Sequence, residues 1–157
     1  MIRTESEYEH TLRRVKQSEE FLRIERDALA AQGRSPDEIK RATDPANSFH
    51  EQLRDEVASY ERLRDGDFEE LKNFAGLGRL LIALRIFQGL SQRELAEKLT
   101  VHESQVSRDE RNEYHGITVE RANRILETLG AELRTSVVTT RHKTASSPNA
   151  GSVLISG

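Results

Sequence analysis

Residues 89–111 read Gly-Leu-Ser-Gln-Arg-Glu-Leu-Ala-Glu-Lys-Leu-Thr-Val-His-Glu-Ser-Gln-Val-Ser-Arg-Asp-Glu-Arg, and this stretch decides the fold. It predicts two short helices separated by one tight turn. Ser91 followed three residues later by Glu94 is a capping box, which marks the start of the first helix. Apolar residues at helical spacing supply the inner faces: Leu95, Ala96 and Leu99 on the first helix, with Val101 and Val106 anchoring the second.

The exposed start of the second predicted helix is polar. It carries His102, Glu103, Ser104 and Gln105, followed by Ser107 and Arg108. A short helix that is held by two apolar anchors and presents hydrogen-bonding side chains outward suits the recognition of base edges in the DNA major groove.

The composition of the whole chain sets broad limits. A length of 157 residues allows one domain or two small ones, and 32% charged with 5% aromatic residues suits helices with solvated faces. The absence of cysteine excludes disulfides and thiolate metal sites. No apolar run approaches the roughly 18 residues that span a membrane, and the first residues lack the apolar stretch of a signal peptide. We therefore expect a cytoplasmic protein with no membrane partner.

The charge distribution is uneven along the chain. The net charge is −3, and residues 1–76 carry 13 basic against 18 acidic residues, whereas residues 77–138 carry 9 of each. The segment that would bind DNA is therefore neutral, so individually placed arginines would have to supply the attraction to phosphates.

Residues 1–66 predict a helical hairpin. Thr4 and Glu7 form a capping box for a first helix that stops before Gly33. The sequence Ser35-Pro36-Asp37-Glu38 starts a second helix, with the proline at the first helical position.

The second hairpin helix leaves two alternatives open, because Pro45 interrupts an apolar pattern that keeps its phase. It is either one kinked helix or two helices that share a face, with Asp44 capping the second. Two amphipathic helices make too small a core alone. We expect the hairpin to pack on a copy of itself or on the rest of the chain, the alternative being a plain solvated spacer.

Beyond the hairpin, the sequence predicts further helices and a strand that could form near the end. The helices are expected at 67–74, 77–88 and 118–128. Gly76 and Gly78 are expected to loosen the joint before the second of these. The β-prone residues 132–138 could form a short strand, and residues 139–157 are expected to be a flexible tail.

Residues 77–129 resemble the helix-turn-helix domain of the Cro/cI-type (XRE) repressor family. The similarity rests on Gly89-Leu90-Ser91-Gln92, Leu95-Ala96, Val106-Ser107-Arg108 and Leu126-Glu127-Thr128-Leu129-Gly130. It implies an all-α chain in which residues 67–138 form a five-helix DNA-binding domain after the 1–66 hairpin.

The resemblance also implies roles for individual residues. Gln92 stands where the family's glutamine commonly touches a DNA phosphate. Arg85 and Glu110 align with a pair that ties the first helix of the domain to the recognition helix, and a bidentate arginine–carboxylate pair would fix its orientation. The base-contacting positions correspond to His102, Glu103, Ser104, Ser107 and Arg108.

The loop after the recognition helix should face the DNA backbone. Arg111, Tyr114 and His115 can all donate hydrogen bonds to phosphate there, although Tyr114 could instead pack on helix 118–128. Two positions depart from the family pattern. Thr100 replaces the usual glycine of the turn, where a positive φ would strain a β-branched residue. Asp109 replaces an apolar or aromatic residue.

The helix expected at 77–88 has a second apolar face. Ile82, Ile86 and Phe87 lie where a freestanding domain of this type usually has polar residues. Such a face needs cover, either from the N-terminal hairpin or from another protomer.

These observations favour a sequence-specific regulator that binds double-stranded DNA, a repressor acting as a homodimer on an inverted repeat. An alternative is a HigA-like antitoxin whose hairpin binds a toxin, and another is a dimerisation hairpin joined to a relic DNA motif. No enzyme is expected, with neither catalytic residues nor a cofactor. No metal site is expected, since Val106 stands where the sequence His102-Glu103 would need a second histidine.

Overall fold

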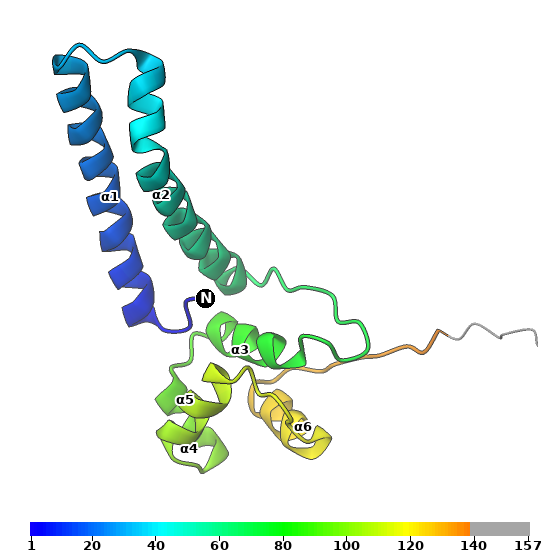
Figure 1. The fold of residues 1–157 in the computed structure, drawn as a ribbon. Helices are drawn as coiled ribbons and strands as arrows, with labels where there is room; N and C mark the ends of the chain where they lie inside the picture. The colour runs from blue at the N-terminus through cyan, green and yellow to red at the C-terminus, as the bar shows by residue number, and fades with distance from the viewer. Residues whose placement is uncertain (139–157) are drawn as a thin grey trace, which may run out of the picture.

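The computed structural model describes residues 1–138, and the predicted tail at 139–157 lies outside them. The described chain is all-α, as predicted, and has two parts (Figure 1). A long antiparallel hairpin of two helices projects from a compact cluster of four. The helices are α1 (Glu5–Ala31), α2 (Pro36–Arg64), α3 (Leu77–Phe87), α4 (Gln92–Leu99), α5 (Glu103–Arg111) and α6 (Val119–Thr128).

Both hairpin helices begin where the sequence predicts, and both starts are capping boxes. The Thr4 hydroxyl accepts from the backbone N–H of Glu7, and Ser35 does the same for Glu38 three residues on. The Glu38 carboxylate accepts from the Ser35 backbone N–H in return, which lowers the pKa of that carboxyl. Gly33 has φ +74° in the turn between the helices, a conformation that glycine adopts without strain.

The helix α2 runs without a break through Pro45, so the chain forms one helix here rather than two, and Asp44 lies inside it instead of capping a second. A proline inside a helix lacks the N–H of one helical hydrogen bond. Pro45 is exposed, so water can satisfy the carbonyl left without a donor.

The hairpin packs on α3 through an apolar layer at its base. Val57 and Tyr60 of α2, together with Ile2 from the N-terminus, belong to the same buried cluster as Ile82 and Ile86 of α3. Ile82 is completely buried and Ile86 is 5% exposed. The second apolar face of α3 is therefore covered by the hairpin of the same chain, which leaves these two isoleucines unavailable to another protomer.

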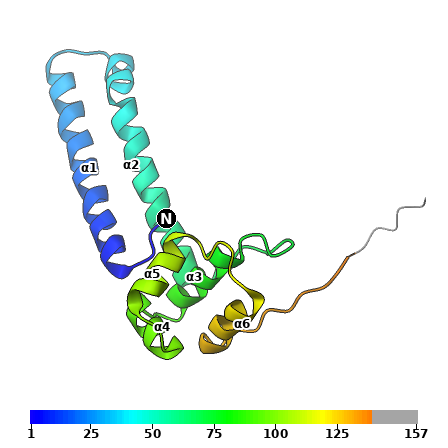
Figure 2. The same ribbon diagram turned by 60° about the horizontal axis from the view of Figure 1, so that its bottom comes forward.

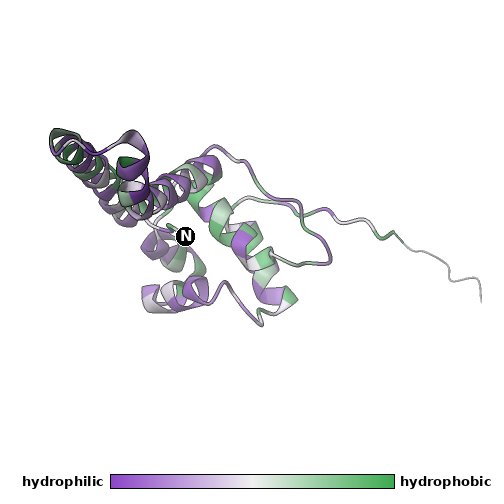
Figure 3. Ribbon diagram, turned by 45° about the horizontal axis from the view of Figure 1, so that its top comes forward, coloured by the Kyte–Doolittle hydropathy of each residue, from purple (hydrophilic) through white to green (hydrophobic). Residues whose placement is uncertain are grey.

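Phe87, the third residue predicted for this apolar face, is not buried like Ile82 and Ile86. It is 47% exposed and meets the ring of Phe68 edge-on, with the ring centroids 5.6 Å apart. Hydrophilic residues dominate the two hairpin helices (Figure 3), which agrees with the acidic N-terminal half of the sequence.

The segment between the hairpin and α3 is not helical, so the predicted helix at 67–74 is wrong. The chain runs extended and then turns at Asn73 and Phe74, which have φ of 53° and 61°. Two successive residues with positive φ cannot belong to a right-handed helix. The C-terminal part of the described chain therefore has four helices instead of five.

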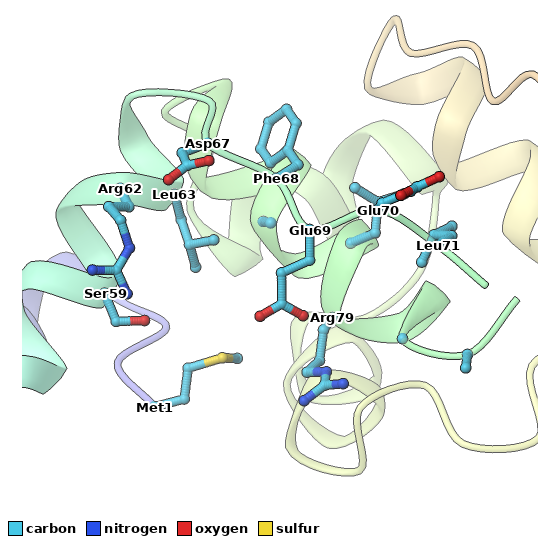
Figure 4. A pocket seen from close by; sticks show the side chains of 14 residues that line it. Met1, Ser59, Arg62, Leu63, Asp67, Phe68, Glu69, Glu70, Leu71 and Arg79 are labelled. Carbon is cyan, nitrogen blue, oxygen red and sulfur yellow. The ribbon is translucent and has the colours of Figure 1, made fainter.

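This segment closes a cavity of about 330 Å³ with the end of α2 and the start of α3 (Figure 4). The apolar side chains of Leu63 and Leu80 line its inner wall. The side chain of Glu69 points toward Arg79 at its rim (Figure 4).

Gly78 does not loosen the joint but allows a close packing contact. It lies inside α3, and a Cβ atom built on it would stand 1.8 Å from the carbonyl oxygen of Glu113. The start of α3 therefore packs directly against the loop that follows α5, and only a residue without a side chain fits there.

Residues 132–138 are extended but pair with no strand in the described chain, so the predicted strand is not formed there. A strand needs a neighbouring strand as partner for its backbone hydrogen bonds. After α6 the described chain runs away from the helical cluster and meets no such partner (Figure 2). Among the helices of residues 1–138, none is both long and apolar enough to cross a membrane.

Candidate nucleic-acid interface

The helix α4 begins as its capping box predicts. The Ser91 hydroxyl accepts from the Glu94 backbone N–H at 3.1 Å, and the Glu94 carboxylate accepts from the Ser91 backbone N–H at 2.7 Å. These hydrogen bonds lower the pKa of the Glu94 carboxyl. Leu95, Ala96 and Leu99 are buried on the inner face, as their spacing predicted.

The turn between α4 and α5 adopts the left-handed conformation that its glycine-like position suggested. Thr100 has φ 57° and ψ 45°, so this β-branched residue tolerates the strain. The guanidinium of Arg124, from α6, donates to the carbonyl oxygen of Leu99 at 2.8 Å. This hydrogen bond satisfies a carbonyl that the end of α4 leaves free and stabilises the turn.

The helix α5 begins with His102 as its capping residue. The imidazole Nδ1 of His102 accepts from the Ser104 backbone N–H at 3.2 Å and lies 2.8 Å from the Ser104 hydroxyl. Glu103, the first residue of the helix, is exposed. His102 and Ser104 are thus hydrogen-bonded to each other at the start of the predicted recognition helix. The Nε2 atom of His102 lies on the side of the ring that faces away from these bonds.

One side of α5 is buried and the other faces solvent. Val106 is 1% exposed and Glu110 is completely buried, whereas Arg108 and Arg111 are exposed and Ser107 is half-buried. Within residues 1–138, neither arginine has an ion-pair or side-chain hydrogen-bond partner. Two unpaired guanidinium groups one turn apart are therefore available to an anionic or acceptor-rich ligand.

Arg85 and Glu110 form a buried ion pair beneath this helix. The Arg85 side chain is 3% exposed and that of Glu110 is fully buried, and the guanidinium binds both carboxylate oxygens, at 2.5 and 2.6 Å. Its remaining N–H groups donate to the carbonyl oxygens of Leu90 at 2.7 Å and Arg3 at 2.9 Å. The fork geometry of arginine satisfies four acceptors at once and fixes the orientation of α5.

Gln92 extends this network to the start of α4. Its Nε2 donates to a carboxylate oxygen of Glu110 at 2.8 Å. An amide nitrogen carries two hydrogens, so the second remains available to an external acceptor. Glu110 therefore orients the side chain that the family resemblance assigns to a DNA phosphate.

Of the three phosphate donors predicted for the loop after α5, Arg111 is instead the last residue of α5, and only Tyr114 and His115 lie in the loop. Arg111 and His115 are exposed and line a groove together with Arg79 from α3. Tyr114 is instead 5% exposed and belongs to the core cluster, and its burial raises the pKa of its hydroxyl. Of the two alternatives left open for Tyr114, the structure shows the packed one, which leaves little of the side chain at the surface for a phosphate.

The unusual residue Asp109 has a polar partner on α6. Its carboxylate accepts from the guanidinium of Arg121 at 2.5 Å. The same guanidinium also lies against Gln105, whose amide oxygen accepts from both terminal nitrogens at 2.8 and 3.0 Å when the amide faces it. An ion pair thus replaces the apolar contact expected beneath α5.

Sequence reasoning missed this cluster, although two signals pointed to it. Asp109 is charged where the family pattern has an apolar residue, and Gln105 lies one helical turn before it on the same face. Arg121, in the first turn of α6, supplies the partner. In the described part of the chain, no group of three or more histidine, aspartate or glutamate side chains could hold a metal ion.

Comparison with known proteins identifies the segment that carries this geometry. Residues 81–135 match the family described as Helix-turn-helix. Searches of curated proteins and of solved structures find no match for the chain. The matched range contains most of α3, all of α4, α5 and α6, and every residue of the Arg85 and Arg121 clusters except Arg3, while the hairpin lies outside it. Residues 81–135 therefore form a helix-turn-helix domain, in agreement with the XRE-type resemblance seen in the sequence.

Proposed function

We propose that the chain is a transcriptional repressor that binds a specific double-stranded DNA sequence as a homodimer. The observation that carries this proposal is the exposed, unpaired Arg108 on a helix whose opposite side is clamped by the Arg85–Glu110 pair. A rigidly held helix with free donors on its outer face can enter a major groove and distinguish base edges.

The exposed side chains of α5 divide the recognition of DNA between them. Arg108 donates to the O6 and N7 atoms of a guanine, and each such bidentate contact discriminates by about 1–3 kcal/mol. Glu103 accepts from a cytosine N4, and Ser104 and Ser107 form single hydrogen bonds with neighbouring bases. His102 caps α5 through its Nδ1 atom, and its Nε2 atom donates a hydrogen bond to a phosphate.

The residues around α5 hold the DNA backbone. Gln92 donates its second amide hydrogen to a phosphate. Arg111, at the end of α5, and His115, in the loop that follows, also contact the DNA backbone. Phosphate contacts set the register of a protein on DNA without reading its sequence. Because the domain is neutral, few phosphates are neutralised per protomer, and useful affinity requires two domains on one site.

The hairpin supplies the surface that joins two protomers. Phe21, Ile24 and Phe49 are 55%, 53% and 45% exposed on helices that project away from α4 and α5 (Figure 1), and Phe21 and Phe49 line one shallow groove. Burial of these side chains against a second copy removes apolar surface from water. The two recognition helices then enter successive major grooves about 10 bp apart on an inverted repeat.

The same three exposed side chains favour one second candidate, an antitoxin whose hairpin neutralises a toxin protein. In that case the hairpin patch binds another polypeptide instead of a copy of itself. The mass of the purified protein in light scattering separates the two functions. A dimer that Phe21→Ser with Phe49→Ser converts to a monomer supports the repressor, whereas a monomeric wild type supports the antitoxin.

Selection of bound DNA from a random pool tests the proposed function. The full-length wild type should enrich one inverted sequence, and Arg108→Ala should enrich it less or lose one position of it. If the wild type enriches no sequence, the chain does not bind DNA specifically. If Arg108→Ala enriches the same sequence equally well, the role of Arg108 is wrong while the function stands.

A further inference from the structure

We propose that Gln105 is an additional DNA-contacting residue, which donates to a backbone phosphate, and that Arg121 holds its amide in the required orientation. The inference rests on the DNA binding proposed above. Gln105 forms a cluster with Asp109 and Arg121 and is not one of the base-contacting positions that the family resemblance implies.

The orientation of the Gln105 amide follows from its partner. The Arg121 guanidinium has only donors, so the amide group must turn its oxygen toward it, with contacts of 2.8 and 3.0 Å. The amide nitrogen with its two hydrogens then points away from Arg121. Since Gln105 is only half-buried, these two donors are accessible to an acceptor outside the protein.

Asp109 fixes the position of the Arg121 guanidinium, which in turn orients the Gln105 amide. Its carboxylate binds the guanidinium at 2.5 Å, with side chains 29% and 36% exposed, so the cluster lies at the surface between α5 and α6. Gln105 and Asp109 are one helical turn apart on α5 and hold the same guanidinium from two sides. Arg121 is thus a positioning residue, while Gln105 carries the contact.

The place of Gln105 on α5 indicates the kind of acceptor. Ser104 and Arg108 lie on the outer side of the helix, and Gln105 lies on the flank that faces α6. When a helix lies in a major groove, its outer side meets the bases and its flanks approach the walls of the groove, which are the sugar–phosphate chains. The Gln105 amide therefore reaches a phosphate oxygen rather than a base.

The experiment measures binding of the full-length protein to its selected DNA site and to a scrambled duplex. Gln105→Met keeps the length of the side chain and removes the donors. It should weaken binding to both duplexes by about 2- to 10-fold, as expected for one hydrogen bond. The salt dependence should stay unchanged, because no charge is lost. Gln32→Met, at the far tip of the hairpin, is the matched control and should bind like the wild type.

A double-mutant cycle tests the role of Arg121. In an Arg121→Met background the Gln105 amide is no longer oriented, so Gln105→Met should then cost less than 2-fold. An undiminished loss in that background would overturn the positioning role. Because each comparison is made within one background, the charge removed with Arg121 cancels.

A second substitution separates contact from stability. Gln105→Glu keeps an acceptor for Arg121 and forms a charge-assisted bond, so the urea midpoint should stay equal or rise. The affinity for DNA should fall further than with Gln105→Met, because a carboxylate repels phosphate.

Two outcomes would contradict the inference while leaving the proposed function intact. Wild-type affinity for both Gln105 variants would show that the cluster serves stability alone. A changed base preference with Gln105→Met would show a base contact instead of a phosphate contact. Failure of the wild type to prefer its selected site would instead contradict the proposed function itself.

Discussion

The guanidinium of Arg85 donates to the main-chain carbonyl oxygen of Arg3 at 2.9 Å, while its other N–H groups hold Glu110. The residue that clamps the recognition helix from below is therefore also bonded to the chain that leads into the hairpin. Together with buried Ile2, this contact makes the first residues of the chain part of the same packed unit as the helix-turn-helix domain, although they lie outside the range that matches that family.

Removal of Arg85 should strongly destabilise the fold. Arg85→Met leaves the completely buried Glu110 carboxylate without its main partner, and breaking a buried pair in this way costs about 3–5 kcal/mol. Urea unfolding measures the loss. Arg93→Met removes an arginine from an exposed pair with Glu97 and should change little. An equally small effect of both changes would mean that the buried pair does not hold the helix.

Relief of strain in the turn should stabilise the protein. Thr100 pays about 1–2 kcal/mol for its left-handed conformation, and glycine avoids that cost but loses about 0.5–1 kcal/mol of backbone entropy. Thr100→Gly should therefore raise the unfolding free energy by about 0.5–1 kcal/mol. The exposed Thr100 side chain has little packing to lose. A lower thermal midpoint for Thr100→Gly would mean that the left-handed conformation of Thr100 costs little.

The close approach at Gly78 should make alanine harmful there. In an ordinary helix interior, replacing glycine by alanine helps by about 1 kcal/mol. At Gly78 the new Cβ would meet the Glu113 carbonyl oxygen at 1.8 Å, so the two elements must separate, and overpacking costs about 1–3 kcal/mol or more. Calorimetry should show a lower midpoint for Gly78→Ala. A higher one would mean that the loop moves aside freely.

The buried position of Tyr114 predicts an effect at alkaline pH but none on DNA affinity. Burial raises its pKa above the ordinary 10.0, so the folded state retains a proton that the unfolded state releases. Its contribution to stability is complete below pH 10 and is lost as the pH rises through the higher folded value. Tyr114→Phe should make stability fall less steeply above pH 10 and should bind DNA like the wild type. A large loss of affinity would restore Tyr114 to the DNA interface.

Local signals in the sequence predicted the helix starts well. The helix starts at Thr4, Ser35 and Ser91 depend on residues within three positions of one another, so they can be recognised without knowledge of distant contacts. At Thr100 the sequence left open whether the turn differs from the family's or keeps a strained positive φ, and the structure shows the positive φ. These elements were sufficient to define the all-α fold and the two helices of the motif.

Contacts between distant segments could not be predicted in the same way. The turn at Asn73 and Phe74 replaces a predicted helix because two residues there adopt positive φ. The sequence allowed Tyr114 to face either DNA or the core. Its buried position depends on how the loop after α5 packs, which the local sequence does not specify. The Arg121 cluster joins two helices through side chains whose pairing no spacing rule specifies. The sequence did not decide whether Ile82 packs against the hairpin or against another protomer. In the structure it packs against the hairpin of the same chain.

In the interface proposed above, Arg108 contacts a base from a helix that the rest of the domain holds in place. The most direct test is a fluorescence anisotropy titration of wild type and Arg108→Ala on the selected duplex and on a scrambled one. Arg108→Ala should reduce the preference for the selected duplex by about 5- to 150-fold, the equivalent of 1–3 kcal/mol. Binding to the scrambled duplex should fall far less. Equal preference in both proteins, or no preference in the wild type, would contradict the claim.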